Sequence, residues 1–185
     1  MAISFERWFN SLVANVIDDF TTDVGASGVD ASVDDLFDAI YILEIANVDS
    51  QVCAILAARQ WADLQESMRG ETGAFQFLPA TAEALGMKGQ GYQGSILGVD
   101  IFKMSDVLTT GGNREGAVFG IGAVGYALGT PGPISGGSQV VTSDSPILVE
   151  LQRDASAATT EVIASGYAGC AILEDAYGVG FVTDA

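Results

Sequence analysis

The first twenty residues place large apolar side chains at helical spacing. These side chains recur in alternating steps of three and one residue, which sets them on one stripe of a helix that Ser4 is positioned to cap. The stripe consists of Phe5, Trp8, Phe9, Leu12, Val13, Val16, Ile17 and Phe20. A stripe this wide and aromatic must lie against a large surface, either the chain's own core or a neighbouring subunit. We expect the chain's own core, and therefore predict that Trp8 and Phe9 are buried.

A second helix is expected after a polar loop. Ser32, with Asp35 three residues later, matches the start of a capped helix, and the helical spacing ends near Ala46. The predicted apolar face consists of Val33, Leu36, Phe37, Ile40 and Leu43.

A buried strand and a third helix follow. The run 51–56, QVCAIL, is short and mostly apolar, which favours a buried strand. The next helix is expected to run through Trp61, Leu64 and Met68. The polar stretch 61–73, WADLQESMRGETG, includes Arg69 and is typical of an exposed helix end with the potential to form an interface.

The middle of the chain, residues 70–136, is rich in glycine. Strand-like segments occur at 95–102 (SILGVDIF) and 116–124 (GAVFGIGAV). Turn-forming sequences stand between and after them, TTGGN at 109–113 and TPGPISGG at 130–137. We expect long loops here.

The last third of the chain alternates at strand spacing. Ile147, Val149 and Leu151 oppose Leu148, Glu150 and Gln152, while Tyr177, Val179 and Phe181 share one face of a final strand. Turn signals at 154–156 and 174–175 separate these runs, so three antiparallel strands fit the spacing.

Composition and charge limit the classes of function. The 185 residues are 49% hydrophobic, enough for one domain with a core and a smaller lobe. The net charge of -17 argues against a surface that wraps nucleic acid by neutralising phosphates. No apolar run is long enough to span a bilayer, and Glu6 and Arg7 interrupt the start, so we expect a soluble, intracellular protein.

The inventory of reactive side chains is poor. The chain has no histidine, and Cys53 and Cys170 lie in apolar runs, so buried free thiols are expected rather than a disulfide or a Cys-His site. Acidic pairs remain, and they are Asp18-Asp19, Asp34-Asp35 and Glu174-Asp175. Such pairs hold cations or transfer protons in some proteins, but on helix starts and turns they are usually solvated. We predict no catalytic, cofactor-binding or metal-binding residue.

The segment 120–125, GIGAVG, matches the G-x-G-x-x-G pattern of dinucleotide-binding loops. That loop needs a helix directly after it, whose N-terminus holds the pyrophosphate. Here Gly129, Pro131 and Pro133 leave too little room for a helix. We therefore interpret the glycines as a closely packed strand and predict that no nicotinamide or flavin nucleotide binds.

Four segments follow one another in an order and spacing similar to those of a known family. They are DVGASGVDASVDDLFDAIYILEIANV (23–48), AILAARQWADLQESM (54–68), GSILGVDIFKMSDVLTTGGNREGAVFGIGAVGYALG (94–129) and ILVELQRDASAATTEVIASGYAGCAILEDAYGVGFVTDA (147–185). Over roughly residues 10 to 185 they resemble the major capsid proteins of tailed bacteriophages, which have the Hong Kong 97-type fold. The second segment resembles the family's P-R-Q-W-x-x-L phrase, with Ala58 in place of the usual proline.

This resemblance implies an α+β, phage capsid-like fold with a spine helix, peripheral antiparallel strands and a central axial domain. Residues 1–50 and 137–185 would form the peripheral-type domain with the spine helix, and 51–136 the axial-type domain. The implied function is a structural subunit that self-assembles, through hexamers and pentamers, into an icosahedral shell around double-stranded DNA. Its partners would be copies of itself and other virion proteins, and its location the virion, assembled in the host cytoplasm.

Members of this family carry an N-terminal arm and an extended hairpin loop before the spine helix. This chain begins at the helix, so we expect a shortened variant or parts supplied from elsewhere. The alternative function is a minor or decorating shell protein or a nanocompartment-type shell subunit, and a carboxylate-dependent hydrolase is less favoured.

The acidity of the chain also predicts how it meets DNA. We expect DNA to be confined by the shell rather than bound by its wall, because close approach of two polyanions is repulsive. A concealed basic face is the alternative, built from Arg59, Arg69, Lys88, Lys103 and Arg114.

Overall fold

The computed structural model describes residues 2–48, 50–70, 77–89, 91–129, 139–142, 147–154, 156 and 159–184. It divides into two compact units, each made of two segments of the chain. The larger unit contains Asn10–Gly125 and Ala171–Ala185, and the smaller unit contains Met1–Phe9 and Tyr126–Cys170.

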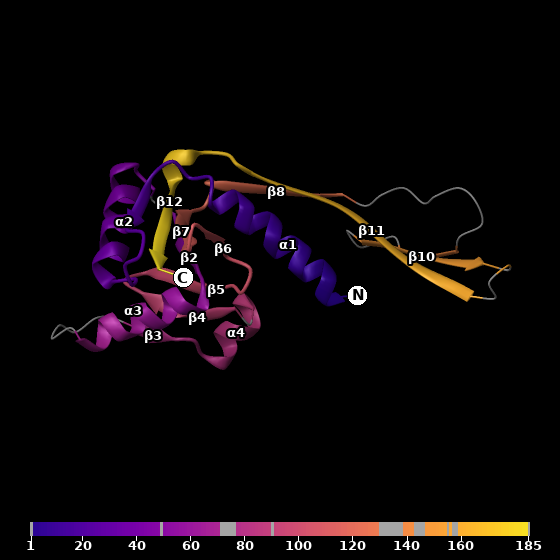
Figure 1. Ribbon diagram of the computed structural model, residues 1–185, viewed down its shortest axis with the longest axis horizontal. Helices are drawn as coiled ribbons and strands as arrows, with labels where there is room; N and C mark the ends of the chain where they lie inside the picture. The colour runs from indigo at the N-terminus through magenta and orange to yellow at the C-terminus, as the bar shows by residue number, and fades with distance from the viewer. Residues whose placement is uncertain are drawn as a thin grey trace. The chain divides into compact units, whose positions relative to one another are not determined.

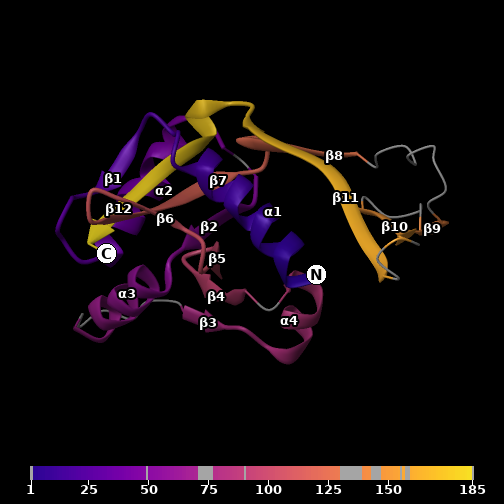
Figure 2. The ribbon, with the colours of Figure 1, turned by 45° about the vertical axis from the view of Figure 1, so that its right-hand side comes forward.

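A mixed sheet organises the larger unit (Figure 1). Its strands are β1 (Asp23–Gly25), β2 (Val52–Leu56), β3 (Phe77–Pro79), β4 (Tyr92–Ile96), β5 (Val99–Lys103), β6 (Leu108–Thr110), β7 (Asn113–Gly120) and β12 (Gly178–Asp184). They are ordered β1-β12-β7-β2-β5-β4-β3, and β6 also pairs with β7. β1 runs parallel to β12 (Figure 2) and β2 runs parallel to β5, whereas β12 and β2 are both antiparallel to β7.

Four α-helices and a short 3-10 helix are present among the described residues. They are α1 (Ala2–Ile17), α2 (Val33–Ile45), α3 (Ala58–Gly70), α4 (Ala82–Lys88) and η1 (Asp175–Tyr177). None of these helices is long and apolar enough to cross a membrane. The combination of helices with mixed sheets makes the fold α+β, as predicted.

The smaller unit contains a four-stranded sheet. Its strands are β8 (Val124–Gly129), β9 (Gln139–Thr142), β10 (Ile147–Asp154) and β11 (Thr159–Ile172), ordered β8-β11-β10-β9. β10 pairs antiparallel with β11 in continuous register from Ile147↔Gly166 to Asp154↔Thr159. Leu148 and Glu150 are buried while Val149 and Leu151 are half-buried, so the predicted two-residue alternation is confirmed.

The core of the larger unit lies between its helices and its sheet. Leu36 and Leu43 of α2 are buried against Ala54, Val118 and Phe181 of the sheet, within one apolar cluster. The start of α2 is set by a capping box, in which the Ser32 hydroxyl accepts from the Asp35 amide and the Asp35 carboxylate accepts from the Ser32 amide. Ala46 forms the C-cap, so both predicted ends of this helix are confirmed.

The first helix differs from its prediction in two ways. α1 begins at Ala2, so Ser4 lies inside the first turn and does not cap it. Ala14 and Ile17 are fully buried, but Trp8 is 36% exposed and Phe9 is half-buried. The prediction that Trp8 is buried is therefore wrong, because apolar spacing defines a helix face and not how far along that face the core extends.

A similar correction applies to α2. Phe37 was expected on the buried face, but its side chain is 42% exposed. Phe37 follows the buried Leu36 by one residue, which is a rotation of about 100° around the helix axis. It therefore lies at the edge of the apolar stripe.

In the described part of the glycine-rich middle, strands joined by tight turns and a short helix take the place of the expected long loops. The segment 95–102 is not one strand, because Leu97 and Gly98 form a two-residue turn between β4 and β5. Both have positive φ angles, 54° and 86°, which matches the twist of a two-residue hairpin. The sequence TTGGN likewise turns β6 into β7, whereas TPGPISGG lies outside the described residues.

The end of the chain does not form three consecutive antiparallel strands. β10 and β11 pair as predicted, but the final strand, β12, belongs to the other sheet, where it lies between β1 and β7. Val179 and Phe181 are buried on β12, while Tyr177 belongs to η1. Strand spacing predicts which side chains share a face, but it carries no information on the choice of partner strand.

Candidate functional site

The segment 120–125 forms a turn between two strands. Gly120 ends β7, the Ala123 amide donates to the Gly120 carbonyl at 3.2 Å, and β8 begins at Val124. Gly122 has a φ of 97°, which a type II turn requires at its third residue. A strand, β8, follows the turn directly, so the motif lacks the helix that a dinucleotide-binding loop needs after its glycines.

Close packing explains the other glycines of this motif. A Cβ added at Gly120 would lie 2.2 Å from Cγ1 of Val48, and one at Gly125 would lie 2.8 Å from a methyl group of Leu173. Close packing is confirmed at Gly120 and Gly125, but the prediction of one strand through this segment is wrong, because residues 121–123 form a turn between β7 and β8. The absence of nucleotide binding stays a prediction.

Gln60 is a buried polar side chain that joins a helix to the sheet. It is fully buried near the start of α3, and its Oε1 accepts from the Ala57 amide at 2.9 Å. Its Nε2 donates to the carbonyls of Phe181 at 2.8 Å and Arg114 at 3.1 Å. A Cβ at Gly116 would lie 2.7 Å from Oε1, so a glycine in β7 makes room for this amide. The three contacts fix the start of α3 over β7 and β12.

Ala58 lies where the resembling family has proline. The Trp61 amide donates to the Ala57 carbonyl, which makes Ala57 the N-cap and Ala58 the first helical residue. Proline is favoured at this position because the first amides of a helix lack an intrahelical acceptor. Ala58 therefore keeps the geometry that a proline would have here.

A charged cluster surrounds Asp100 on β5. This carboxylate is buried and accepts from Lys88 Nζ at 2.5 Å, from the Tyr92 hydroxyl at 3.2 Å and from the Gln51 amide. Lys88 also lies over the Tyr92 ring, 4.6 Å from its centroid. These contacts connect α4, β4, β5 and the start of β2.

The Asp100 cluster has a defined protonation state. Burial by itself raises the pKa of Asp100, but hydrogen bonds from Lys88 and Gln51 and the charge of Lys88 outweigh it, so the pKa lies below its usual value of 3.8. The hydrogen bond to Asp100 raises the pKa of Lys88. The cluster is therefore an ion pair at neutral pH and holds no group poised to exchange a proton there.

Two of the three acidic pairs have hydrogen-bond partners in the fold through one of their members. Asp35 belongs to the capping box of α2, and Asp175 accepts from the amide and hydroxyl of Thr21. Partial burial, with repulsion from Asp19 and Asp23, raises the pKa of Asp18. Two of the three pairs thus stabilise a helix start or a loop.

Most residues of the possible basic face are paired with acceptors inside the fold. Arg59 pairs with Asp30 at 3.3 Å and with Asp63 at 3.1 Å, and Lys88 pairs with Asp100. Arg114 donates to the Val107 carbonyl at 3.3 Å. The structure thus gives three of these five cations acceptors within the larger unit.

Asp63 faces Arg59 with one carboxylate oxygen only. Its Oδ2 is buried and has no hydrogen-bond partner among the described residues. Burial is the main cause that raises the pKa of Asp63, and Arg59 opposes it.

Cys53 and Cys170 are both thiols, as predicted, and both are half-buried rather than fully buried. Burial, with a smaller contribution from the Asp100 charge, raises the pKa of Cys53 to about 11. The Cys53 thiol is therefore protonated and unreactive at neutral pH.

Hollows lined by described residues occur on the larger unit. One, of about 100 Å³, is lined by Asp18, Asp23 and Glu115 beside Gly116 and Gly180. The other, of about 400 Å³, lies between β1 and α2 and is lined by Asp23, Asp35, Asp38, Tyr41 and Ile42, among others. Within the described part of the chain, no three His, Cys, Asp or Glu side chains are arranged to hold a metal ion.

Large apolar side chains are exposed on both units. On the larger unit they include Val29, Tyr41 and Ile45 near or on α2, and Leu78, Leu85 and Met87 on β3 and α4. On the smaller unit they include Tyr126, Leu128, Val162 and Tyr167. Apolar side chains exposed in groups mark surfaces that bind other proteins.

The buried polar contacts described above stabilise the fold, and the exposed apolar side chains are accessible to a partner. Sequence reasoning missed Gln60 and the Asp100 cluster. Their signals were a polar residue three positions after the N-cap of a helix and an acid inside an apolar strand. It also missed α4, which Thr81 caps by accepting from the Ala84 amide at 3.2 Å.

Solved structures with a similar fold identify the fold of this chain. No protein family and no curated protein matches the chain by sequence. A chain of Mycobacterium phage Che8 is 19% identical and superposes with a TM-score of 0.65 over 97% of this chain and 60% of its own length. The capsid of Ralstonia phage GP4 is 15% identical, with a TM-score of 0.62 over 98% of this chain and 64% of its own length.

An encapsulin is similar to the same degree. The encapsulin of the holo-SrpI complex from Synechococcus elongatus PCC 7942 is 13% identical, with a TM-score of 0.62 over 99% of this chain and 63% of its own length. The chain thus spans less than two thirds of the length of each of these solved chains. Since nearly all of its residues superpose on them, the chain has the α+β fold of bacteriophage capsid proteins.

Proposed function

We propose that this chain is a structural subunit of a bacteriophage capsid, and that its copies assemble into a closed icosahedral shell around double-stranded DNA. One observation carries the proposal. The likeness to the capsids of Ralstonia phage GP4 and cyanophage P-SCSP1u extends over 98% and 97% of the chain, with TM-scores of 0.62 and 0.54.

The polar side chains of the larger unit support a structural role. Gln60 joins α3 to β7 and β12, Asp100 joins α4, β4 and β5, and Asp35 caps the start of α2, each through buried or half-buried hydrogen bonds. These contacts give each of the three groups a role within the fold. We therefore propose that the subunit has no enzyme activity.

The arrangement within a shell is part of the same proposal. We assign the chain to the Hong Kong 97 type, with residues 1–50 and 137–185 peripheral and 51–136 axial, and with hexamers and pentamers as the assembling species. The two compact units divide the chain at other residues, so a reconstruction of the shell is what tests these boundaries. Assembly in the host cytoplasm and residence in the virion follow from the proposal.

The second candidate is a nanocompartment-type shell subunit, favoured by the likeness to the encapsulin. The two functions differ in content. Particles of a capsid subunit purified from infected cells would protect double-stranded DNA from nuclease, whereas particles of a nanocompartment would contain no such DNA.

Sedimentation velocity tests the proposal directly. The purified chain, examined over a range of protein and salt concentrations, is expected to form species much larger than the 19.1 kDa monomer. Because the net charge of -17 opposes association, assembly is expected to strengthen as salt screens this repulsion. A chain that sediments as a monomer under every condition would contradict the proposal.

A further inference from the structure

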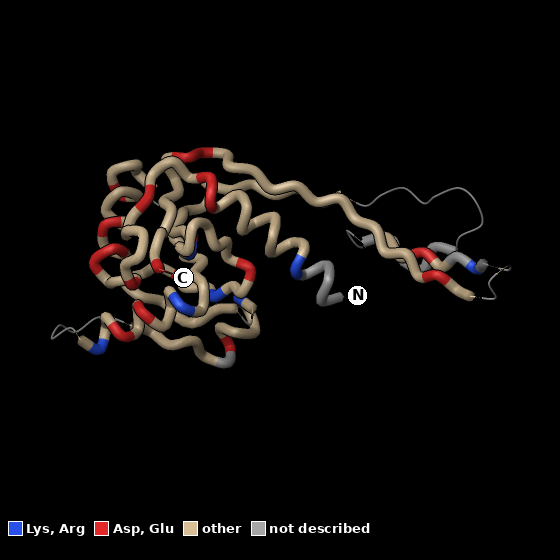
Figure 3. The backbone as a smooth tube through the Cα atoms, viewed as in Figure 1, with Lys and Arg blue, Asp and Glu red and all other residues tan. Residues whose placement is uncertain are grey.

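Charged residues are absent from most of the sheet of the smaller unit. Residues 116–143 and 162–173 contain no Asp, Glu, Lys or Arg, in a chain with a net charge of -17. These two ranges supply β8, β9 and most of β11. Figure 3 shows β8 and the adjoining part of β11 without a charged residue, whereas charged residues lie on β10 and at the start of β11. This sheet therefore contributes little to the negative charge of the chain.

One face of this sheet is apolar. In the antiparallel register of β10 and β11, Leu151 lies opposite Val162, and Val149 lies opposite Ala164. Residues that lie directly opposite each other in such a pair share a face of the sheet. None of these four side chains is buried, because Val162 is 48% exposed and the other three are half-buried.

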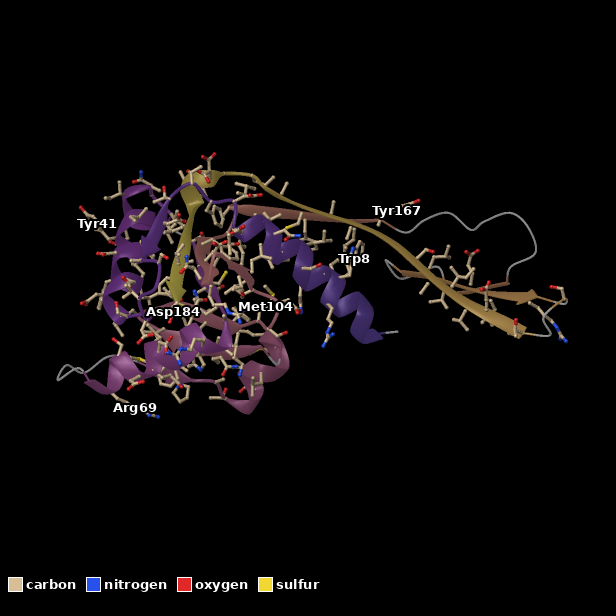
Figure 4. The ribbon with its side chains drawn as sticks, in the orientation of Figure 1. Trp8, Tyr41, Arg69, Met104, Tyr167 and Asp184 are labelled. Atoms are coloured by element: carbon tan, nitrogen blue, oxygen red, sulfur yellow. The ribbon has the colours of Figure 1, made fainter. Side chains whose placement is uncertain are left out.

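β8 extends the same face. A Cβ added at Gly129 would lie 3.5 Å from Cβ of Tyr167 (Figure 4), so these two residues point to the same side of the sheet. Side chains alternate along a strand, which puts Tyr167 on the face opposite to Val162, and puts Tyr126 and Leu128 on the face opposite to Gly129. Tyr126 is 76% exposed and Leu128 is 43% exposed. The resulting surface, the open face, consists of Tyr126, Leu128, Val149, Leu151, Val162 and Ala164.

The opposite face of the sheet is covered along β10. Leu148 and Glu150 alternate with the open-face residues of this strand, and each is 1% exposed. An antiparallel sheet with one covered face ordinarily presents polar side chains on the other. The open face is apolar instead, and an apolar sheet face is stable when a second layer packs on it.

A second copy of the chain fits the open face in charge and in area. The charged residue on this side of the β10–β11 pair is Arg153, near the hairpin end opposite Thr160, so two open faces can meet without bringing carboxylates together. Strands rise about 3.4 Å per residue and lie about 4.8 Å apart, so β8, β10 and β11 present about 500 Å² per copy. The total of about 1,000 Å² reaches the lower limit for a specific protein interface.

We propose that the open face of one copy packs against the open face of a second copy. Because the same surface meets itself, the contact has twofold symmetry and closes at a dimer. The two sheets would lie about 10 Å apart, as in a β-sandwich. The inference rests on the proposed function for its role, since an icosahedral shell has twofold axes at which one surface of a subunit meets its equivalent.

Two matched tyrosines test this contact. Tyr126→Asp places a charge on the open face, and Tyr167→Asp places the same charge on the opposite face, at positions that are 76% and 67% exposed. Val162→Asp is a second test variant, on a different strand. Circular dichroism is expected to show the same fold for all three. In sedimentation velocity, Tyr126→Asp and Val162→Asp are each expected to dimerise at least about tenfold more weakly than the parent, and Tyr167→Asp to dimerise as the parent does.

The parent chain provides a second measurement that does not depend on the folding of any variant. Tetranitromethane nitrates accessible tyrosine rings, and peptide mass spectrometry measures the rate at each ring. As the protein concentration is raised through the range of dimerisation, nitration of Tyr126 is expected to slow as the fraction of monomer falls. Nitration of Tyr167 is expected to keep its rate in the dimer.

The possible results separate this inference from the proposed function. Open-face variants that dimerise as the parent does, an equal loss in Tyr167→Asp, or an unchanged rate at Tyr126 would overturn the inference. The proposed function would survive these results if the parent assembles into larger species. A parent that forms this dimer and nothing larger would support the contact and contradict the shell, whereas a parent that stays monomeric would contradict both.

Discussion

At the scale of single residues, the Asp100 cluster stabilises the larger unit by satisfying a buried carboxylate. Lys88, Tyr92 and Gln51 all donate to it, from three different elements. Removing Lys88 leaves the two neutral donors in place but leaves the charge of Asp100 uncompensated. This costs more than the loss of a neutral hydrogen bond.

Lys88→Met is therefore expected to lower the free energy of unfolding by about 1 to 3 kcal/mol at pH 7. Lys103→Met is the matched control, an exposed lysine whose replacement is expected to change stability by less than about 0.5 kcal/mol. Urea unfolding followed by circular dichroism measures both.

The same variant has a defined pH dependence. The pKa of Asp100 is lowered in the folded state, so the ion pair contributes fully above the usual pKa of 3.8 and its contribution is lost as the pH falls through the folded-state value. The difference between Lys88→Met and the parent is expected to shrink below about pH 4. A difference that stays constant down to pH 2.5 would show that Lys88 does not act through the Asp100 carboxylate.

Cys53 offers a second test at this scale. Its pKa of about 11, against an ordinary 9.0, reduces the thiolate fraction at pH 8 about a hundredfold. In a Cys170→Ser background, iodoacetamide is expected to alkylate Cys53 about a hundredfold more slowly in the folded protein than in urea. Equal rates in the two states would mean that the thiol is not buried as described.

The types of reactive side chain could be read from the sequence, but their contacts could not. The absence of histidine and the apolar setting of Cys53 were readable directly. The partners of Asp100 were not, because Gln51 and Lys88 lie 49 and 12 positions away and meet it through strand pairing. Trp8 shows the same limit, since its exposure depends on where the core ends.

At the scale of elements, one buried amide ties α3 to the sheet. Gln60→Leu preserves volume but removes three hydrogen bonds and leaves the Ala57 amide and the carbonyls of Arg114 and Phe181 unsatisfied. We expect it to lower the free energy of unfolding by about 2 to 4 kcal/mol. Gln65→Leu, at a half-buried glutamine on the same helix, is the matched control, expected to cost less than about 0.5 kcal/mol. Equal effects in chemical denaturation would show that the Gln60 contacts contribute little.

The start of α3 gives a further prediction. Ala58→Pro places proline at the first helical position, where it is expected to be tolerated and to raise stability by about 0.4 to 1 kcal/mol by restricting the unfolded chain. Ala62→Pro, one turn further into the same helix, is expected to cost about 3 kcal/mol or more. Thermal unfolding of both variants measures the contrast, and a loss of stability in Ala58→Pro would mean that Ala57 or Ala58 has another geometry.

The elements that were predicted well are those whose boundaries are set locally. Ser32 and Asp35 define the start of α2 within four residues, and the run before Ala58 reads as a strand because it is apolar throughout. The hairpin at Leu97-Gly98 was missed because leucine seldom adopts a positive φ, and only the pairing of β4 with β5 requires it here. The place of β12 between β1 and β7 was equally inaccessible, since pairing across the whole chain length leaves no local signal.

At the scale of the whole molecule, the chain combines a strongly negative charge with exposed apolar side chains on both units. A monomeric protein of this charge would stay dispersed, and its apolar surfaces would remain in water at a cost. The proposed assembly would cover those surfaces, and screening by salt would reduce the repulsion that opposes it. The likeness to shell proteins over nearly the entire chain is consistent with this balance.

Electron microscopy of the purified chain, at the salt concentration where sedimentation shows the largest species, tests the central claim most directly. We predict closed shells or rings the size of capsid assembly units, with a reconstruction in which the larger unit repeats around each ring. Uniform particles the size of a 19.1 kDa monomer, or amorphous aggregates without symmetry, would contradict the account.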